Sequence, residues 1–175
     1  MTMSMHSASV PVFVRMLANV ATWLDKAEAH AKARNFEPAV YLEARLAPDM
    51  LPFPAQIQIA CDMAKFCVAR LSGAEAPKFA DDEKTLADLK ARIAKTSEFL
   101  RSVSADALDG TDDKSVTIPR RGGTMTMTGE AYLKHWALPN FYFHATTTYA
   151  LLRQYGVELG KADFLGGPPP GATVA

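Results

Sequence analysis

The sequence predicts an all-α fold of four long helices, with a small β-hairpin before the last of them. Three observations lead to this fold class. Apolar residues recur at three- and four-residue steps in four long segments, which places them on one face of a helix. Prolines and glycines separate these segments. Between the third and fourth segments, residues 114–127 alternate with the two-residue period of a strand.

The composition of the 175-residue chain is that of one globular domain with a hydrophobic core. Apolar residues make up 49% and charged residues 22%. The 19 basic and 19 acidic residues balance to a formal net charge of zero, so we expect neither a nucleic acid nor a membrane as partner. No apolar run reaches the roughly 18 residues of a membrane span, and the N-terminal stretch resembles a first helix more than a signal peptide.

The two cysteines, Cys61 and Cys67, lie on one predicted helix. Six residues at a rise of about 1.5 Å separate them by roughly 9 Å along the axis, beyond the reach of a disulfide. With no disulfide framework and no secretion signal, a cytoplasmic location is expected.

The first helix is expected over residues 8–34, with Ser7 or Ser9 as N-cap and Pro11 in its first turn. A short helix is expected over residues 37–46. The first helix has one apolar stripe, made of Phe13, Met16, Leu17, Val20, Leu24 and Ala27.

The second long helix is expected over residues 53–72 and is more apolar than a surface helix. It nevertheless carries Gln58 and Asp62, four residues apart and therefore on one face. An acidic side chain in a buried helix needs a partner. Two interpretations stay open: Asp62 is exposed or bonded to Lys65 or Arg70, or it faces the bundle interior as a ligand or acid–base group.

The third helix is expected over residues 82–103, with Asp81 or Asp82 as its N-cap. Its charged residues, Arg92 among them, are mixed in sign as on a solvated face. In the hairpin that follows, SVTIP and TMTMT flank RRGG. The arginines of this turn have the charge to bind an anion, but exposed turn arginines usually have no specific role.

The fourth helix, expected over residues 129–156, carries the candidate site. A buried imidazole or carboxamide costs about 1–3 kcal/mol unless it is hydrogen-bonded, so Asn140 and His144 need partners. Pro139 removes one helical hydrogen bond and frees the carbonyl of His135, which predicts a kink. Steps of three and four residues define the presumed inner face of the fourth helix, which consists of Leu133, Trp136, Asn140, His144, Thr147 and Leu151.

Two interpretations of His144 stay open. It ligates a divalent metal, with Asn140, Gln58, Asp62 or a water completing the shell, or it is a core histidine bonded to Asp62, Gln58, Thr147 or a tyrosine. One histidine is thin support for zinc, which usually takes three or more strong ligands. The sequence contains no nucleophile motif, phosphate loop or dinucleotide fingerprint.

The run HATTTYALLRQYGVELGKADFLG resembles the end of the DinB/YfiT-like helical-bundle superfamily. More narrowly, SMHSASVPVFVRML, ARLAPDMLPFPAQIQIACDMAK and LPNFYFH resemble an uncharacterised bacterial family of that superfamily, a domain of unknown function. This match covers most of residues 4–166. It implies a four-helix bundle of up-down-down-up type, often dimeric. The resemblance also implies a divalent metal held by three histidines in the active members of the superfamily. Some of those members are thiol-dependent transferases or hydrolases.

The resemblance places His144 at the second histidine of the family's HxxxH motif and Asn140 at the first. The third histidine is expected from the second helix, where this chain has Gln58 and Asp62. Two of the three ligands are therefore changed, which implies a degenerate metal site.

The sequence thus predicts a DinB-like domain over residues 1–166, forming a cytoplasmic homodimer, and a disordered Pro/Gly-rich tail over residues 167–175. Two hypotheses describe its function. The first is a small-molecule-binding or structural protein without a cofactor, with a polar core network of Asn140, His144 and Asp62. The second is an enzyme dependent on a divalent metal (Zn, Ni or Mn), of the thiol-dependent transferase or hydrolase type, with a His/Asn/Asp shell.

Overall fold

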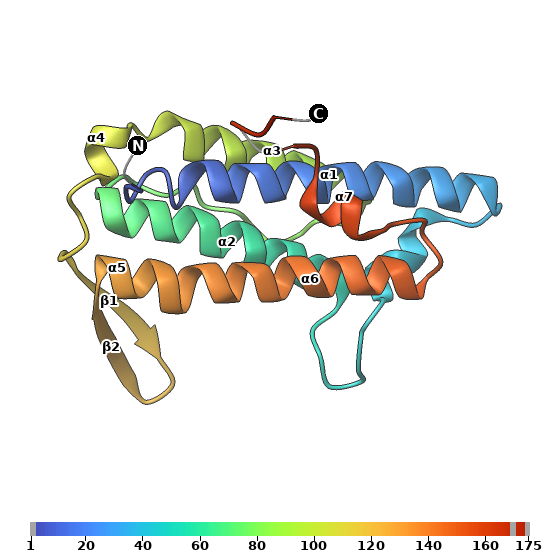
Figure 1. The fold of residues 1–175 in the computed structure, drawn as a ribbon. Coiled ribbons are helices and arrows are strands. Elements are labelled where there is room, and N and C mark those ends of the chain that lie inside the picture. Colours follow the sequence, from blue (N-terminus) through green and yellow to red (C-terminus); the bar gives the residue numbers. More distant parts are fainter. Residues whose placement is uncertain (1–2, 169–170, 174–175) are drawn as a thin grey trace.

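Four long helices lie side by side in this computed structural model, which describes residues 3–168 and 171–173 (Figure 1). They are α1 (Val10–Ala33), α2 (Phe53–Ser72), α3 (Leu86–Ser102) and a composite fourth helix of α5 (Gly129–Tyr132), η2 (Leu133–Ala137) and α6 (Leu138–Gln154). α1 and the fourth helix run one way, and α2 and α3 run the other (Figure 1). The predicted all-α bundle of up-down-down-up type is thereby confirmed.

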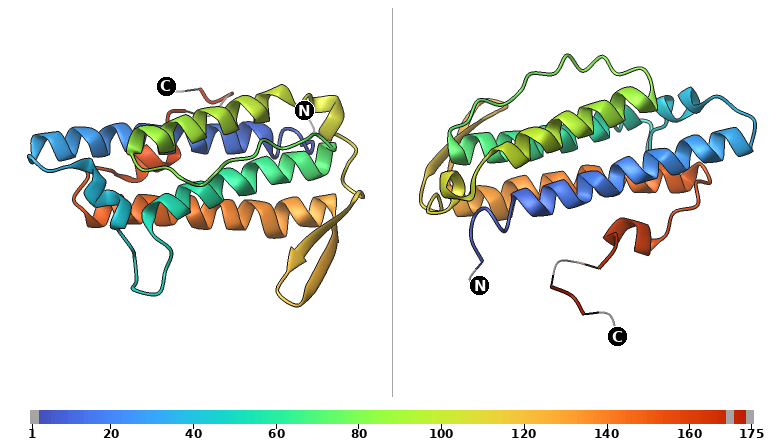
Figure 2. Two further views of the ribbon diagram at one scale, coloured as in Figure 1. Left: turned by 180° about the vertical axis from the view of Figure 1, so that it is seen from behind. Right: turned by 90° about the horizontal axis from the view of Figure 1, so that it is seen from above.

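The segments between the long helices carry the remaining elements. η1 (Pro38–Glu43) is a 3₁₀ helix, and α4 (Ala105–Leu108) and α7 (Lys161–Leu165) are short α-helices. β1 (Ser115–Arg120) and β2 (Gly123–Thr128) pair antiparallel, with Ser115 opposite Thr128. This predicted hairpin projects from one end of the bundle (Figure 1). The α2–α3 linker, residues 73–85, runs back along the outside of the bundle (Figure 2).

The core lies where the four helices meet. α1 and α2 both contact α3 and α6, so the four helices form a closed ring. Phe13 of α1 meets Phe141 of α6 edge to face, with ring centroids 4.9 Å apart. Both side chains are fully buried, and each contributes about 1.5–3 kcal/mol of transfer free energy. The two cysteines are buried, and both are free.

The C-terminal ends of α2 and α6 lie within two residues of the expected boundaries, whereas the start of α3 does not. Gly73 takes the left-handed conformation with φ +88°, and Val157 closes α6 by donating to the carbonyl of Leu152. The start of α3 was predicted too early, because the hydroxyl of Thr85, not Asp81 or Asp82, caps it by accepting from the backbone of Asp88.

The inner face of the fourth helix differs in part from the predicted one. The predicted Leu133, Thr147 and Leu151 are buried, but Ala137, Phe141 and Ala145 take the core positions predicted for Trp136, Asn140 and His144. Thr148 and Leu152 are buried as well, so the centre of the stripe lies about one residue on. Asn140 and His144 are half-buried at the border of the core. Apolar residues surround this helix, so periodicity alone could not decide between two neighbouring stripes.

A kink was predicted at Pro139, and the helix just before this residue contains a π-helical turn. The turn covers Leu133–Ala137, and the backbone N–H of Leu138 donates to the carbonyl of Leu133, five residues back. A proline lacks the N–H that the preceding turn would bond, and a wider turn is one way to accommodate it.

None of the helices among the described residues is long and apolar enough to cross a membrane. The predicted disordered tail falls partly outside the described residues, since 169–170 and 174–175 are not described. Residues 167–168 and 171–173 are neither helix nor strand.

Candidate functional site

His144 contacts a residue that the sequence did not single out. Its Nδ1 lies 2.8 Å from Oε1 of Gln56, a side chain of α2 that is 1% exposed. The Nε2 of Gln56 donates to the carbonyl of Leu51 at 2.9 Å, so its Oε1 is the acceptor for His144. Burial lowers the pKa of His144, which favours the neutral imidazole. A glutamine among the apolar residues of a core helix was the signal that could have pointed to Gln56.

Asn140 is satisfied by its own helix. Its Nδ2 donates to the carbonyl of Trp136 at 2.6 Å, one turn back. Thr147 and Thr148 likewise donate to the carbonyls of Phe143 and His144, at 2.8 and 2.9 Å. The polar side chains along α6 therefore bond mainly within the helix, and Asn140 is engaged away from any shared site.

Gln58 and Asp62 belong to a separate cluster between α2, α3 and the α2–α3 linker. Arg92 of α3 is its centre and is 3% exposed. Its guanidinium donates to Asp62 at 2.8 Å, to Glu83 at 2.9 Å and to Asp81, while Gln58 donates to Glu83 at 2.7 Å. The expectation that Arg92 belongs to a solvated face is wrong, because these carboxylates compensate its burial.

Lys65 is the second cationic partner of Asp62. Its Nζ lies 2.9 Å from the Asp62 carboxylate, one of the two pairings considered from the sequence. Arg70, the other, instead donates to the hydroxyl of Tyr132 at 2.8 Å.

The electrostatics of this cluster indicate a structural clamp. Burial alone would lower the pKa of Arg92, but hydrogen bonds to Glu83 and Asp81 raise it above its ordinary value. Burial would raise the pKa of Glu83, yet the hydrogen bonds from Arg92 and Gln58 lower it. The guanidinium also lies over the ring of Phe79, 4.6 Å from its centroid. The cluster holds the linker against α2 and α3.

The four predicted ligands therefore do not form one metal shell. His144 bonds to Gln56, Asn140 to its own helix, and Gln58 and Asp62 belong to the Arg92 cluster. Gln56 lies on the side of α2 that faces α6, whereas residues 58 and 62 face α3, because each residue advances about 100°. Within the described residues, no group of three or more His, Cys, Asp or Glu side chains could hold a metal ion. The donor set does not fit the divalent metal that the sequence resemblance implied.

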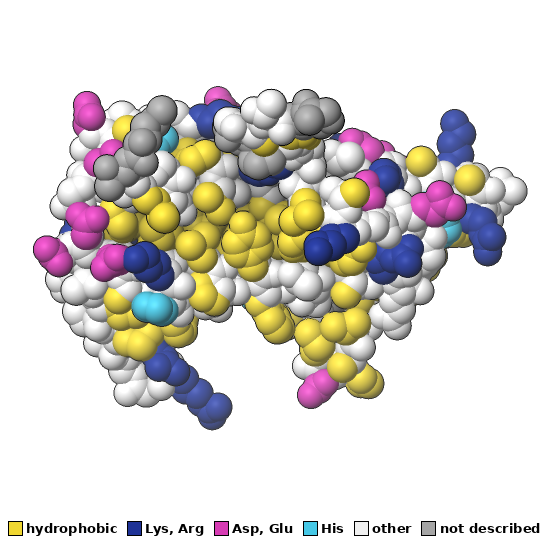
Figure 3. All heavy atoms as spheres, in the orientation of Figure 1, with side chains coloured by type: hydrophobic (Ala, Val, Ile, Leu, Met, Phe, Trp, Pro, Cys, Tyr) yellow, Lys and Arg dark blue, Asp and Glu magenta, His cyan; other side chains and the backbone are white. Residues whose placement is uncertain are grey.

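A cavity of about 690 Å³ lies between α1, α6 and the segment around α7. Apolar side chains from α1 and the C-terminal segment form much of its wall, among them Val12, Met16 and Phe164. Its polar side chains are Arg15, Asn19 and Tyr142. Hydrophobic side chains gather on this face between α1 and α6 (Figure 3).

Residues 161–168, here called the C-terminal strap, cover one side of this cavity. The indole Nε1 of Trp23 donates to the carbonyl of Asp163 at 3.1 Å, and Lys26 pairs with the Asp163 carboxylate at 2.6 Å. The Nδ2 of Asn19 donates to the carbonyl of Phe164 at 2.9 Å, and the Phe164 ring stacks on Trp23. Each of these contacts ties the strap to α1.

Gly166 lets the strap turn closely against α1. Its φ is +72°, a conformation that side chains disfavour, and a Cβ there would lie 2.6 Å from Oδ1 of Asn19. Arg15 donates to the carbonyls of Leu165 at 3.0 Å and of Gly167, so the guanidinium also holds the strap.

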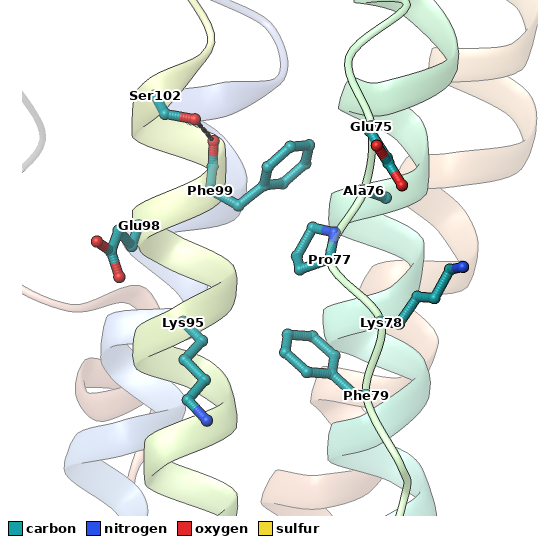
Figure 4. A pocket seen from close by; sticks show the side chains of 9 residues that line it. All are labelled: Glu75, Ala76, Pro77, Lys78, Phe79, Lys95, Glu98, Phe99 and Ser102. Atoms are coloured by element: carbon teal, nitrogen blue, oxygen red, sulfur yellow. Dashed lines mark hydrogen bonds between the residues drawn. The ribbon is translucent and has the colours of Figure 1, made fainter.

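A second hollow, of about 740 Å³, lies between α3 and the α2–α3 linker (Figure 4). Phe79 and Phe99 stand on its two walls, among Glu75, Lys78, Lys95 and Glu98. Because charges of both signs surround this open groove, its lining favours no class of ligand. The cavity beneath the strap has the more selective lining.

The bundle, its helix order and the hairpin define the class of protein as a DinB-like four-helix bundle. A crystal structure of a DinB family member protein from Shewanella denitrificans is 40% identical to this chain. The similarity covers 96% of this chain and 95% of that one, with a TM-score of 0.86.

The pattern of the family DUF1993, described as a domain of unknown function, matches residues 5–165. The chain therefore belongs to this family, and the resemblance inferred from its sequence is confirmed. No curated protein matches the chain.

Proposed function

We propose that this chain is a small-molecule-binding DinB-like protein with a degenerate metal site, and that the cavity beneath the C-terminal strap is its binding site. The observation that carries the proposal is the cavity itself. Its volume, about 690 Å³, lies within the roughly 300–1,000 Å³ of ligand pockets, and a few polar groups interrupt an apolar lining.

The degenerate metal site is supported by the separate partners of the predicted ligands. The Asp62 carboxylate is held by two buried cations, Arg92 and Lys65. The neutral imidazole of His144 joins α6 to α2 through Gln56, which is a structural role.

A neutral apolar dye tests the binding site directly. We expect N-phenyl-1-naphthylamine to bind saturably, with a rise in fluorescence. Val12 lines the cavity and is half-buried, so Val12→Trp fills it without replacing a core residue. This substitution should raise the dissociation constant of the dye by about tenfold or more, which corresponds to about 1.4 kcal/mol of binding free energy. Ala18→Trp, at an exposed position of α1, is the control. Equal binding by both variants would contradict the proposal.

The alternative function, a divalent-metal-dependent enzyme, is tested by metal analysis of protein purified without a His-tag. Stoichiometric Zn, Ni or Mn that is lost in a folded His144→Ala variant would support the enzyme and contradict the degenerate site. We expect substoichiometric metal, and a melting temperature that does not change on adding these ions.

We also propose that the protein is a cytoplasmic homodimer. Support comes from the exposed face of α6, which lies between the hairpin and the loop after η1, two segments that project to the same side (Figure 1). Phe143 is 56% exposed and Leu46 of that loop is 45% exposed, and both line one shallow hollow. Adjacent exposed apolar side chains of this size favour a protein partner.

A further inference from the structure

The cavity beneath the strap is lined by charge of one sign only, among the described residues. Of the described residues that line it, Arg15 alone carries a charge, and none is acidic. Arg15 is in no ion pair within the described part of the chain; its guanidinium donates instead to the neutral carbonyls of Leu165, Gly167 and Pro168. A guanidinium bonded only to carbonyls keeps its positive charge uncompensated.

The wall of the cavity contributes a second donor. Tyr142 of α6 lines the same cavity with a half-buried phenol. Burial raises the pKa of Tyr142, and the positive charge of Arg15 acts in the opposite direction. The neutral phenol keeps its proton and can donate it to an oxygen. Arg15 and Tyr142 thus offer donors from two helices across one apolar cavity.

We propose that the cavity takes an apolar molecule bearing one carboxylate, with Arg15 as its counter-ion and Tyr142 as a second hydrogen-bond donor. This inference rests on the proposed function and adds the ligand's chemical class. The apolar body lies against Val12, Met16 and Phe164. The carboxylate lies at the guanidinium as its counter-ion, because the strap carbonyls take only part of the five N–H donors of Arg15. An amine in the same place would face a positive charge without an acidic partner.

Three ten-carbon probes that differ only in the headgroup separate the chemical class from simple binding. Each probe displaces N-phenyl-1-naphthylamine in a titration kept below the micelle concentrations of decanoate and decylamine and below the solubility limit of decanol. We expect decanoate to bind on the order of tenfold more tightly than decanol, and decylamine to bind more weakly than both. Equal binding of decanoate and decanol, or tighter binding of decylamine, would overturn the carboxylate and leave the proposed function standing. Failure of all three to bind would overturn both.

Variants of Arg15 show whether the charge itself selects the ligand. Because Arg15 also holds the strap, the decisive quantity is the ratio of the dissociation constants of decanol and decanoate. In Arg15→Gln this ratio should fall from about ten to about one, while Arg15→Lys should keep a preference for decanoate. Arg34→Gln, at the exposed end of α1, is the control and should keep the wild-type ratio. An unchanged ratio in Arg15→Gln would mean that Arg15 only binds the strap and does not select the ligand, which would overturn the proposal.

Discussion

Nδ1 of His144 and Oε1 of Gln56 lie 2.8 Å apart across the interface between α6 and α2. Since the amide nitrogen of Gln56 is committed to the carbonyl of Leu51, this contact assigns the ring proton to Nδ1. The same glutamine thereby connects α6, α2 and the loop that precedes α2. Protonation of His144 at Nε2 would keep this hydrogen bond but place a positive charge on a half-buried side chain.

The stability of the protein should fall in mild acid through His144. Burial lowers its folded-state pKa below the value of 6.5 taken for the unfolded chain. The unfolded state therefore binds a proton first, and the free energy of unfolding decreases as pH falls through and below about 6.5. Urea unfolding at pH 8 and pH 5 measures this decrease, which should be smaller in His144→Gln. His135→Gln, which removes an exposed imidazole from the same composite helix, is the control. If the free energy of unfolding of His144→Gln decreases between pH 8 and pH 5 as much as that of the wild type, His144 is not the source of the pH dependence.

Arg92 should be among the most sensitive charged positions. Arg92→Ala leaves Glu83 and Asp62 short of a buried partner, and breaking such a pair costs about 3–5 kcal/mol. Because the Asp62 carboxylate keeps Lys65 and is partly exposed, we expect the lower end, about 3 kcal/mol, in urea unfolding. Arg101→Ala, on the exposed face of α3, should stay within about 0.5 kcal/mol. Similar losses in both variants would contradict the clamp.

The close turn of the strap at Gly166 gives a prediction with a matched control. Gly166→Ala places a methyl against the Asn19 amide, so this amide or the strap must shift and the hydrogen bond from Asn19 to Phe164 is disturbed. We therefore expect the dye to bind severalfold more weakly. Gly171 has a similar φ, +83° against +72°, but its Cβ would meet nothing within 4 Å. Gly171→Ala therefore also places an alanine at a positive φ, but without the contact. If both variants bind the dye like the wild type, the strap does not form the cavity wall.

The dimer should depend on Phe143. Phe143→Ser removes the largest exposed apolar side chain of α6, so we expect the protein to shift to a monomer in sedimentation equilibrium. Met3→Ser serves as the control, since Met3 is 77% exposed and lies outside the α6 face. A wild-type monomer, or a dimer that Phe143→Ser leaves intact, would refute this interface.

The fold was predictable because its signals are local. Gly73, with its missing side chain, marks the end of α2, and alternation around the arginine–glycine turn marks the hairpin. The start of α3 was missed because Asp81 and Thr85 are both good capping residues. A tertiary contact decided between them, since Asp81 is taken by Arg92.

The functional residues were harder to predict because they depend on tertiary packing. Arg92 does lie on the buried stripe of α3, three residues after Leu89 and four before Thr96, and this spacing was a usable signal. The strap cavity had no such signal. Arg15, Tyr142 and Phe164 meet only once the C-terminal segment has docked on α1, and no spacing along the chain encodes that contact.

The central claim is that small molecules bind between α1, α6 and the strap. Carbon-13 methyl NMR of methionine-labelled protein, titrated with decanol, tests it most directly. The methyl of Met16 lines the cavity, whereas Met63 lies on α2 away from it. The account predicts a saturable shift of the Met16 resonance and an unmoved Met63. A Met16 resonance that stays in place while decanol binds would contradict the account.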